Sequence, residues 1–344
     1  MPRHRSPFPF AGLSVAALLT AAAATPAAAT DSPSVLFVRG ADRSGGFLEA
    51  DNDAERTEQL ADINNLATNN GNHGWGQLAG LLRDSGFNVT QIEETVEAGA
   101  ASTGQTNGVA VPFETLDLSV YDAIVFGSNN AEYNSAQVSA VDTYIRNGGG
   151  ALFISDANFG SGWADAANSD QAFVGQYGLN VYQDQGTYAL AGDELLVPDH
   201  PILDGVVGFD GEGVSPFEVV GGVEDVDITI LARAEGSVRL NDDPNGGRGD
   251  SRSAGLNDAA LVVAEVGLGR VVGHFDRNTF FNDNGAGSDL NRDTSRRDGS
   301  PAIANDDYAR NLFTFLTVPE PASAFLLTAV LPLLARKRHP RDRA

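Results

Sequence analysis

The sequence contains no cysteine. Disulfide bonds are therefore excluded, and the fold depends on its core for stability even if the protein reaches an oxidising compartment. Thiol nucleophiles and thiolate metal sites are excluded for the same reason. Every reaction that requires a cysteine is thus beyond this chain.

Positively charged residues are also scarce. The chain has 22 Lys and Arg against 46 Asp and Glu, which gives a net charge of −24. Residues 30–317 alone carry a net charge of −29, because seven basic residues lie in the two terminal segments. Such a surface repels phosphate backbones, so we expect no nucleic-acid partner. It suits a salty or cation-rich exterior.

The N-terminal segment has the order of a secretory signal. Arg3 and Arg5 precede an apolar run over Phe8–Ala24, and small residues follow up to Ala29. The alternative, a membrane anchor, needs about 20 apolar residues, and this run is shorter. We therefore predict a signal peptide over residues 1–29, with signal peptidase cleaving near Ala29.

The C-terminal segment, residues 318–344, has three parts. Pro319, Glu320 and Pro321 come first, followed by a short apolar stretch over Ala322–Ala335 and a basic cluster over Arg336–Arg338. The cluster is expected to stay cytoplasmic and halt export, so that the helix anchors the chain before processing. The alternative is an ordinary short C-terminal anchor.

This tail resembles the PEP-CTERM sorting signal. The resemblance implies processing near Pro319, Glu320 and Pro321 by an exosortase in a Gram-negative, often biofilm-forming bacterium. Under either reading of the tail, residues 30–317 lie outside the cytoplasm. We expect them in the periplasm, the outer envelope or the extracellular matrix.

Residues 30–317 alternate between buried-strand and helical patterns, which predicts an α/β fold with a parallel sheet flanked by helices. Helices are predicted over Asp53–Ala67, from Trp75 to the stop at Gly86, and from a cap at Ser135 to Gly148. The first four predicted strands are Val35–Val38, Phe87–Ile92, Ala123–Gly127 and Ala151–Ile154.

The second half of the chain adds shorter strands and long polar loops. A hairpin is predicted from Ala259–Val266 and Arg270–Phe275, because Gly267 and Gly269 flank a tight turn. Acidic, polar loops are expected over Asn241–Asn257 and Asn282–Ala304. A closing helix is predicted over Asp306–Leu316, with Tyr308, Leu312 and Phe315 on one face.

The layout resembles the class I glutamine amidotransferase-like superfamily, including its ThuA-like branch. The pieces that carry the resemblance are VLFV, LDLSVYDAIVFGSNN, AQVSAVDTYIRNGGGALFISD, DHPILDGV, GLGRVVGHFDRNTFFN and DDYARNLFTFL. It implies a flavodoxin-like domain over residues 30–317. It also implies a nucleophilic cysteine after the strand ALFI, where this chain has Ser155, Asp156 and Ala157. Glutaminase activity is therefore excluded, and no Gly-x-Ser-x-Gly motif replaces the nucleophile.

Polar residues follow the predicted strands where ligands collect in open α/β sheets, at the carboxyl ends of the strands. Their amides, carboxylates and imidazole suit a polyhydroxylated ligand such as a glycan. Alternatively, Asn and Asp are simply common in turns, where they bond their own backbone. The predicted ligand-binding residues are Ser128, Asn129, Asn130, Asp156, Asn158, His274 and Asp276.

Three functions are compatible with this pattern. The leading hypothesis is a surface or matrix protein whose non-catalytic domain binds carbohydrate or another polar ligand. The second is an extracellular glycan hydrolase with Asp156 paired with Asp276 or Glu132 as acid and base, and with His274 as a further candidate. The third is a purely structural envelope protein. A binding protein would present exposed aromatic side chains, and the candidates are Trp163, Tyr177 and Tyr182.

No cofactor is assigned, although calcium is a candidate. Asp289, Asn291 and Asp293 supply oxygen ligands at every second position, as calcium loops do. The EF-hand pattern fails, because Thr294 stands where glycine is needed and Ser300 where the bidentate Glu belongs. The alternative is a solvated acidic loop. His200 is expected to order the turn before Pro201 rather than to bind zinc, because no paired histidines occur.

Overall fold

A computed structural model of the protein describes residues 32–39, 75–93, 95–96, 108–127, 133–155, 170–182, 187–212, 214–239, 251–281, 290, 294–295, 302–303 and 305–318. All of them belong to the unit Ser32–Ala344. The helix predicted over residues 53–67 lies outside the described residues.

The main sheet has a parallel half of five strands. In the order in which they pair, these are β2 (Asn88–Glu93), β1 (Ser34–Arg39), β5 (Ala123–Gly127), β6 (Gly150–Ile154) and β15 (Gly269–His274). Each strand is parallel to its neighbours within this half. Every residue of β5 and β6 is buried, which explains why these segments are continuous apolar runs.

The other half of the sheet is antiparallel. β14 (Asp258–Val266) turns back into β15, which confirms the predicted hairpin. Beyond β14 lie β10 (Phe217–Val219) and β7 (Leu179–Val181), and β11 (Val226–Arg233) also pairs with β14. Gly267 in the turn has a φ of 62°. A side chain there would be strained and would press on the Arg146 backbone.

Four short strand pairs accompany the main sheet. They are β3 (Thr95–Val96) with β4 (Gly108–Val109), β8 (Thr187–Ala191) with β9 (Gly208–Glu212), β12 (Ser237–Arg239) with β13 (Ser251–Ser253), and β16 (Thr294–Ser295) with β17 (Ala302–Ile303). Three of these strands, β13, β16 and β17, lie in segments that the sequence predicts to be loops. A strand of two or three residues is too short to show the alternation of apolar and polar residues, so its sequence cannot be distinguished from that of a loop.

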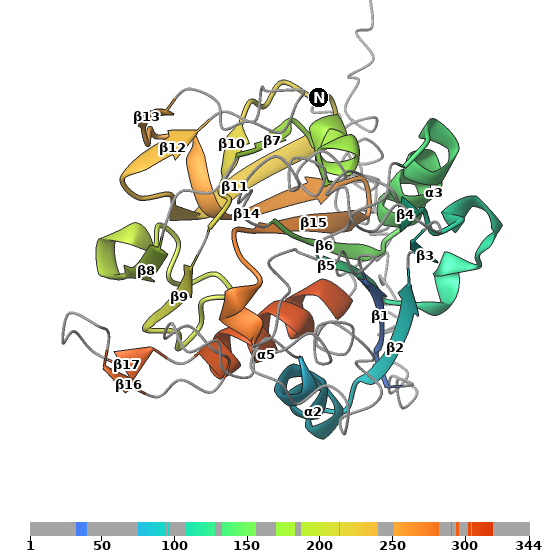
Figure 1. Cartoon of the computed structure of the whole chain (residues 1–344), viewed down its shortest axis with the longest axis horizontal. Helices are drawn as coiled ribbons and strands as arrows, with labels where there is room; N and C mark the ends of the chain where they lie inside the picture. Colours follow the sequence, from blue (N-terminus) through green and yellow to red (C-terminus); the bar gives the residue numbers. More distant parts are fainter. Residues whose placement is uncertain are drawn as a thin grey trace, which may run out of the picture. The chain divides into compact units, whose positions relative to one another are not determined.

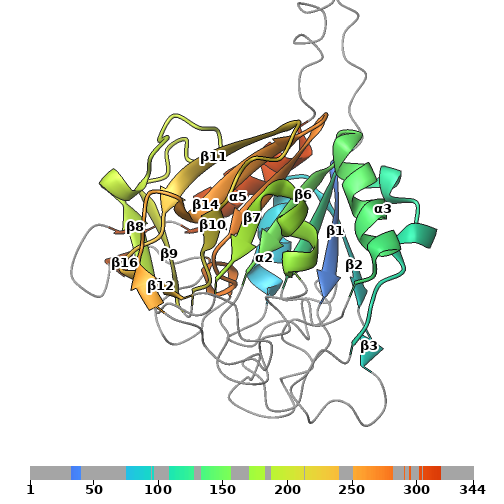
Figure 2. The same ribbon diagram turned by 90° about the horizontal axis from the view of Figure 1, so that it is seen from above.

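Helices cover both faces of the sheet (Figures 1 and 2). α2 (Gly76–Asp84) and α5 (Asn305–Thr317) pack on one face, and α3 (Ser135–Arg146) packs on the other. Among the described residues no helix is long and apolar enough to cross a membrane. The predicted fold class, α/β with a parallel sheet flanked by helices, is confirmed.

The cap predicted at Ser135 is one residue off. Asn134 is the N-cap, because its side chain accepts hydrogen bonds from the Ala136 and Gln137 backbone N–H groups at 2.9 and 3.1 Å. Oε1 of Gln137 in turn accepts a hydrogen bond from the Asn134 N–H at 2.9 Å, which completes a capping box. Asn and Ser are about equally favoured at the N-cap, so the sequence alone does not distinguish Asn134 from Ser135 as the capping residue.

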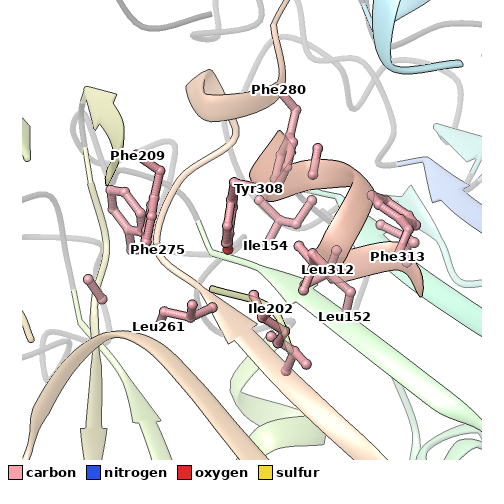
Figure 3. Packing of buried hydrophobic residues seen from close by; sticks show 14 of the residues in the cluster. Leu152, Ile154, Ile202, Phe209, Leu261, Phe275, Phe280, Tyr308, Leu312 and Phe313 are labelled. Atoms are coloured by element: carbon pink, nitrogen blue, oxygen red, sulfur yellow. The ribbon is translucent and has the colours of Figure 1, made fainter. Parts of the chain in front are cut away.

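The core between the sheet and α5 is rich in aromatic side chains (Figure 3). Tyr308 stacks on Phe209 with 4.3 Å between ring centroids, and Phe313 stacks on Phe37 at 5.8 Å. The predicted face of α5 is confirmed for Tyr308 and Leu312, which are fully buried, whereas Phe315 is only partly buried.

In the part of the chain that the structure describes, five short 3-10 segments connect these elements. They are η1 (Phe113–Thr115), η2 (Leu118–Val120), η3 (Gly175–Tyr177), η4 (Gly192–Glu194) and η5 (Asn278–Phe280). η5 follows β15 after a link of three residues and contacts β9 and α5. η1 and η2 lie against α3 on the other face of the sheet.

Candidate functional site

The carboxyl ends of the parallel strands meet at one edge of the sheet. β1 has β2 on one side and β5 on the other, so the strand order reverses between β1 and β5. Arg39 and Gly127 end these two strands and are paired in register. This switch point is where open α/β sheets place their ligands.

An aromatic side chain closes the core beneath this switch point. Trp75 precedes α2, is buried, and lies edge-on to Phe37 with 5.8 Å between centroids. Its ring lies so close to Gly127 that a Cβ on this residue would overlap it. Gly127 is therefore needed for close packing of Trp75 rather than for backbone flexibility.

Ser155 continues the chain directly after β6. Its N–H donates to the His274 carbonyl at 2.8 Å, so the residue is held against the end of β15. The side chain is fully buried, and its hydroxyl has no hydrogen-bond partner within the described part of the chain. A buried polar group in this condition costs roughly 1–3 kcal/mol of stability.

His274 ends β15, at the edge where the sequence places it, but its side chain points into the core. The imidazole is fully buried on the face of the sheet that α5 covers. Its Nδ1 is 2.8 Å from the Tyr308 hydroxyl, and its Nε2 is 3.0 Å from Oγ1 of Thr279.

The surrounding bonds determine the tautomer of this imidazole. Thr279 Oγ1 donates its proton to the Asp210 carbonyl at 2.7 Å, so towards His274 it acts as an acceptor. These two contacts favour the tautomer with the proton on Nε2, in which Nδ1 accepts from the Tyr308 O–H. Burial lowers the pKa of His274 to about 3, which keeps the ring neutral at ordinary pH.

The same network extends to α5 through Asn305. Its side-chain amide donates to Oδ1 of Asp210 at 2.9 Å, and its Oδ1 accepts from the Asp210 N–H at 3.2 Å. Residues of β15, η5, β9 and α5 are thus joined through buried polar groups. With both ring nitrogens hydrogen-bonded, His274 is held as a structural group and has no nitrogen free to act as a general base.

Asp276 lies two residues beyond β15 and is also fully buried. Its Oδ1 accepts a hydrogen bond from the Asn278 N–H at 3.1 Å, which helps to start η5. Gly211 on β9 leaves room for this carboxylate, because a Cβ there would come within 2.5 Å of Oδ2. The structure thus places Asp276 close to the His274 strand end, in a turn-ordering role.

The remaining predicted site residues lie outside the described residues. They are Ala29, Ser128, Asn129, Asn130, Glu132, Asp156, Asn158, Trp163, Asp289, Asn291, Asp293, Pro319, Glu320 and Pro321. Their roles stay predictions. Within the described ranges, no group of three or more His, Asp or Glu side chains is arranged to hold a metal ion.

Two aromatic side chains expected to be exposed in a binding protein are buried. Tyr177 and Tyr182 are each 1% exposed, and their hydroxyls bond to Asp142 at 3.2 Å and Asp258 at 2.8 Å. His200 has the structural role expected for it, because its Nδ1 accepts from the Ile202 N–H at 3.2 Å.

Sequence reasoning missed the partners of His274. Thr279 and Asn305 carry no motif, and Asp210 lies far from both in sequence. Tyr308 was identified only as a member of an apolar helix face. Its hydroxyl was the available signal, because a tyrosine predicted to be fully buried needs a polar partner.

Comparisons with known proteins find similarity only among solved structures, because no protein family and no curated protein matches the chain. The N-terminal domain of mmIFT52 is 11% identical, with a TM-score of 0.44, and the match covers 84% of this chain and 99% of that domain. Two similar structures are described as ThuA-like.

These two proteins come from Parabacteroides merdae ATCC 43184 and Bacteroides uniformis ATCC 8492. They are 11% and 12% identical to this chain, each with a TM-score of 0.40. The matches cover 83% and 85% of this chain, and 90% and 95% of the two proteins. The similarity concerns the backbone and assigns no activity.

Proposed function

We propose that this protein is an exported, envelope-associated protein whose α/β domain binds a polar ligand, with carbohydrate as the first class to test. The ligand would bind at the carboxyl edge of β1, β5 and β6. Ser155 and the predicted residues Ser128, Asn129, Asn130, Asp156 and Asn158 would supply its hydrogen bonds.

The observation that carries this proposal is the buried Ser155 hydroxyl, which has no partner among the described residues. The Ser155 side chain is fully buried in the ligand-free chain, so a ligand would reach its hydroxyl only if the surrounding residues moved, and it would then supply the missing hydrogen-bond partner. Carbohydrate hydroxyls suit this role, because each one both donates and accepts hydrogen bonds. The position of Ser155 also fits, since it follows a strand next to the switch point of the sheet.

Binding is favoured over catalysis by the state of His274. The side chain that would serve as a base at this edge has its Nε2–H directed to Thr279 and its Nδ1 occupied by Tyr308. Asp276, one member of the carboxylate pair required by the hydrolase hypothesis, is buried and accepts a backbone hydrogen bond.

The export part of the proposal is supported by the two terminal segments. The order of charge, apolar run and small residues up to Ala29 is that of a signal peptide. The Pro-Glu-Pro tail with its basic cluster resembles an exosortase substrate. The excess of acidic residues and the absence of cysteine are compatible with a location outside the cytoplasm.

A glycan array probed with the purified full-length chain, followed by calorimetry on the hits, tests the binding proposal. Replacing Ser155 or Asp156 by Ala should weaken binding by about tenfold, the effect of losing one good hydrogen bond. Asp84→Ala and Ser85→Ala are matched controls. They change a neighbouring Asp–Ser pair in the turn between α2 and β2, at the opposite edge of the sheet.

Three outcomes would overturn the proposal. Equal loss of affinity in the control variants would place the ligand elsewhere. Failure to bind any glycan would favour the purely structural hypothesis. Shortening of a bound glycan, with Asp156→Ala stopping turnover but not binding, would show that the protein is a hydrolase.

A further inference from the structure

A pocket of about 490 Å³ lies at the opposite edge of the sheet from the candidate site. It is lined by residues of η1 and η2, by the last turn of α3, and by residues just before β5 and β6. Its volume is within the range of small-molecule sites, roughly 300–1,000 Å³. None of the predicted site residues takes part in it.

The backbone segments beside this pocket pack around the ring of Tyr144. Tyr144, on the last turn of α3, lies against Gly149, where a Cβ would overlap its ring. The Tyr144 hydroxyl donates to the Tyr121 carbonyl at 3.2 Å. The preceding Gly148 has a φ of 113°, which favours glycine. The glycines after α3 thus hold the ring at the pocket wall, where Phe113 and Tyr121 add further aromatic lining.

The charged groups of the pocket are all acidic. Glu114 and Asp122 line it, and no Lys or Arg does so among the described residues. The carboxylate of Asp122 is held in place, because its Oδ2 accepts from the Ser34 N–H at 2.7 Å. Burial, and then the negative charge of Asp122, raises the pKa of the Tyr144 hydroxyl.

The last turn of α3 contributes to the same potential. Thr143, Tyr144 and Asn147 line the pocket, so it is next to the C-terminal end of a twelve-residue helix. The partial negative charge at the end of a helix attracts cations. The only basic residue of this turn, Arg146, is paired with Asp142 at 3.0 Å and does not line the pocket.

We propose that this pocket binds a small organic cation, an ammonium group on an apolar or hydroxylated body. Glu114 and Asp122 supply the opposite charge. Among the described aromatic residues of the lining, Phe113 and Tyr144 are buried and Tyr121 is partly exposed, so Tyr121 is the ring available for a cation–π interaction with an ammonium group. The apolar walls accommodate the carbon body. The net charge of −24 raises the local concentration of any such cation near the protein. This site does not depend on the proposed carbohydrate site.

Choline and its neutral isostere 3,3-dimethylbutan-1-ol separate charge from shape. Calorimetric titration of the purified full-length chain should give saturable binding of choline, and binding of the alcohol weaker by about tenfold or more. Equal binding of the two compounds would show that the pocket recognises only apolar surface. No saturable binding of choline would contradict the proposal directly.

Charge-removing variants locate the binding site. Glu114→Gln and Asp122→Asn should each weaken choline binding by about three- to fivefold, the effect of one partly exposed ion pair. Asp122→Asn keeps an oxygen acceptor for the Ser34 N–H, so folding is preserved. Glu224→Gln and Asp204→Asn are matched controls, because both residues are exposed and neither lines the pocket. Equal weakening in the controls would mean that the overall field of the protein attracts choline, and would refute the pocket.

Discussion

The buried, neutral His274 should make the protein lose stability in mild acid. Burial holds the pKa of its imidazole at about 3, whereas the unfolded chain has a value near 6.5. Because the folded pKa is lowered, the unfolded state binds more protons at every pH between these two values. Stability is therefore fully present above about pH 6.5 and falls as the pH drops towards 3.

The magnitude follows from the two pKa values. One unit of pKa corresponds to about 1.4 kcal/mol, so lowering the pH from 7 to 5 should remove about 2 kcal/mol from the free energy of unfolding. Protonating His274 within the folded state would not restore this stability. Nδ1–H and the Tyr308 O–H would then be two donors facing each other. Carboxylates titrate in the same range, so the effect of His274 has to be isolated.

Urea unfolding of the wild type and of His274→Gln, each at pH 7 and pH 5, separates the effect of His274 from that of the carboxylates. The variant is expected to be less stable at both pH values but to lack the loss of about 2 kcal/mol between them. His200→Gln is the control. Burial and the charge of Arg270 lower the pKa of His200, but its ring is only half-buried, so a smaller difference is expected. Identical pH dependence in the wild type and His274→Gln would refute the assigned state of this imidazole.

Three further predictions concern stability and processing. Thr279→Val should lower the free energy of unfolding by about 2 kcal/mol, because it leaves the His274 N–H and a backbone carbonyl without their partner; chemical denaturation that finds no loss would contradict the network. Arg252→Ala should cost roughly 1–3 kcal/mol, because it leaves the buried Asp258 carboxylate without its ion-pair partner, whereas Arg310→Ala, in an exposed pair, should cost under about 0.5 kcal/mol; equal melting temperatures of the two variants would contradict this difference. Mass spectrometry of native protein should find an N-terminus near Thr30 and no residues beyond the Pro-Glu-Pro region, and an intact chain in the cytoplasm would contradict export.

Two of the parallel strands, β5 and β6, were predictable because their burial on both faces gives them continuous apolar sequences. AIVFG and GALFI are continuous apolar runs, and the helix between them has Val138, Val141 and Ile145 on one face. The hairpin between β14 and β15 was equally clear, because glycines flank its turn. The short strands were not, since two residues carry no periodicity.

The position of His274 was predictable, but its role was not. The sequence places it at the end of a strand, yet the direction of its side chain depends on the alternation that also points Val272 towards α5. Its partner Tyr308 is 34 residues further along the chain. Such long-range pairing follows from packing and leaves no local signal.

Ser155→Ala is the decisive variant for a ligand site at the carboxyl edge of the sheet. We expect this variant to unfold at the same or a higher denaturant concentration than the wild type, because a hydroxyl without a partner among the described residues is removed. The same variant should bind the glycan identified on the array about tenfold more weakly. Loss of stability together with unchanged glycan affinity would contradict the account.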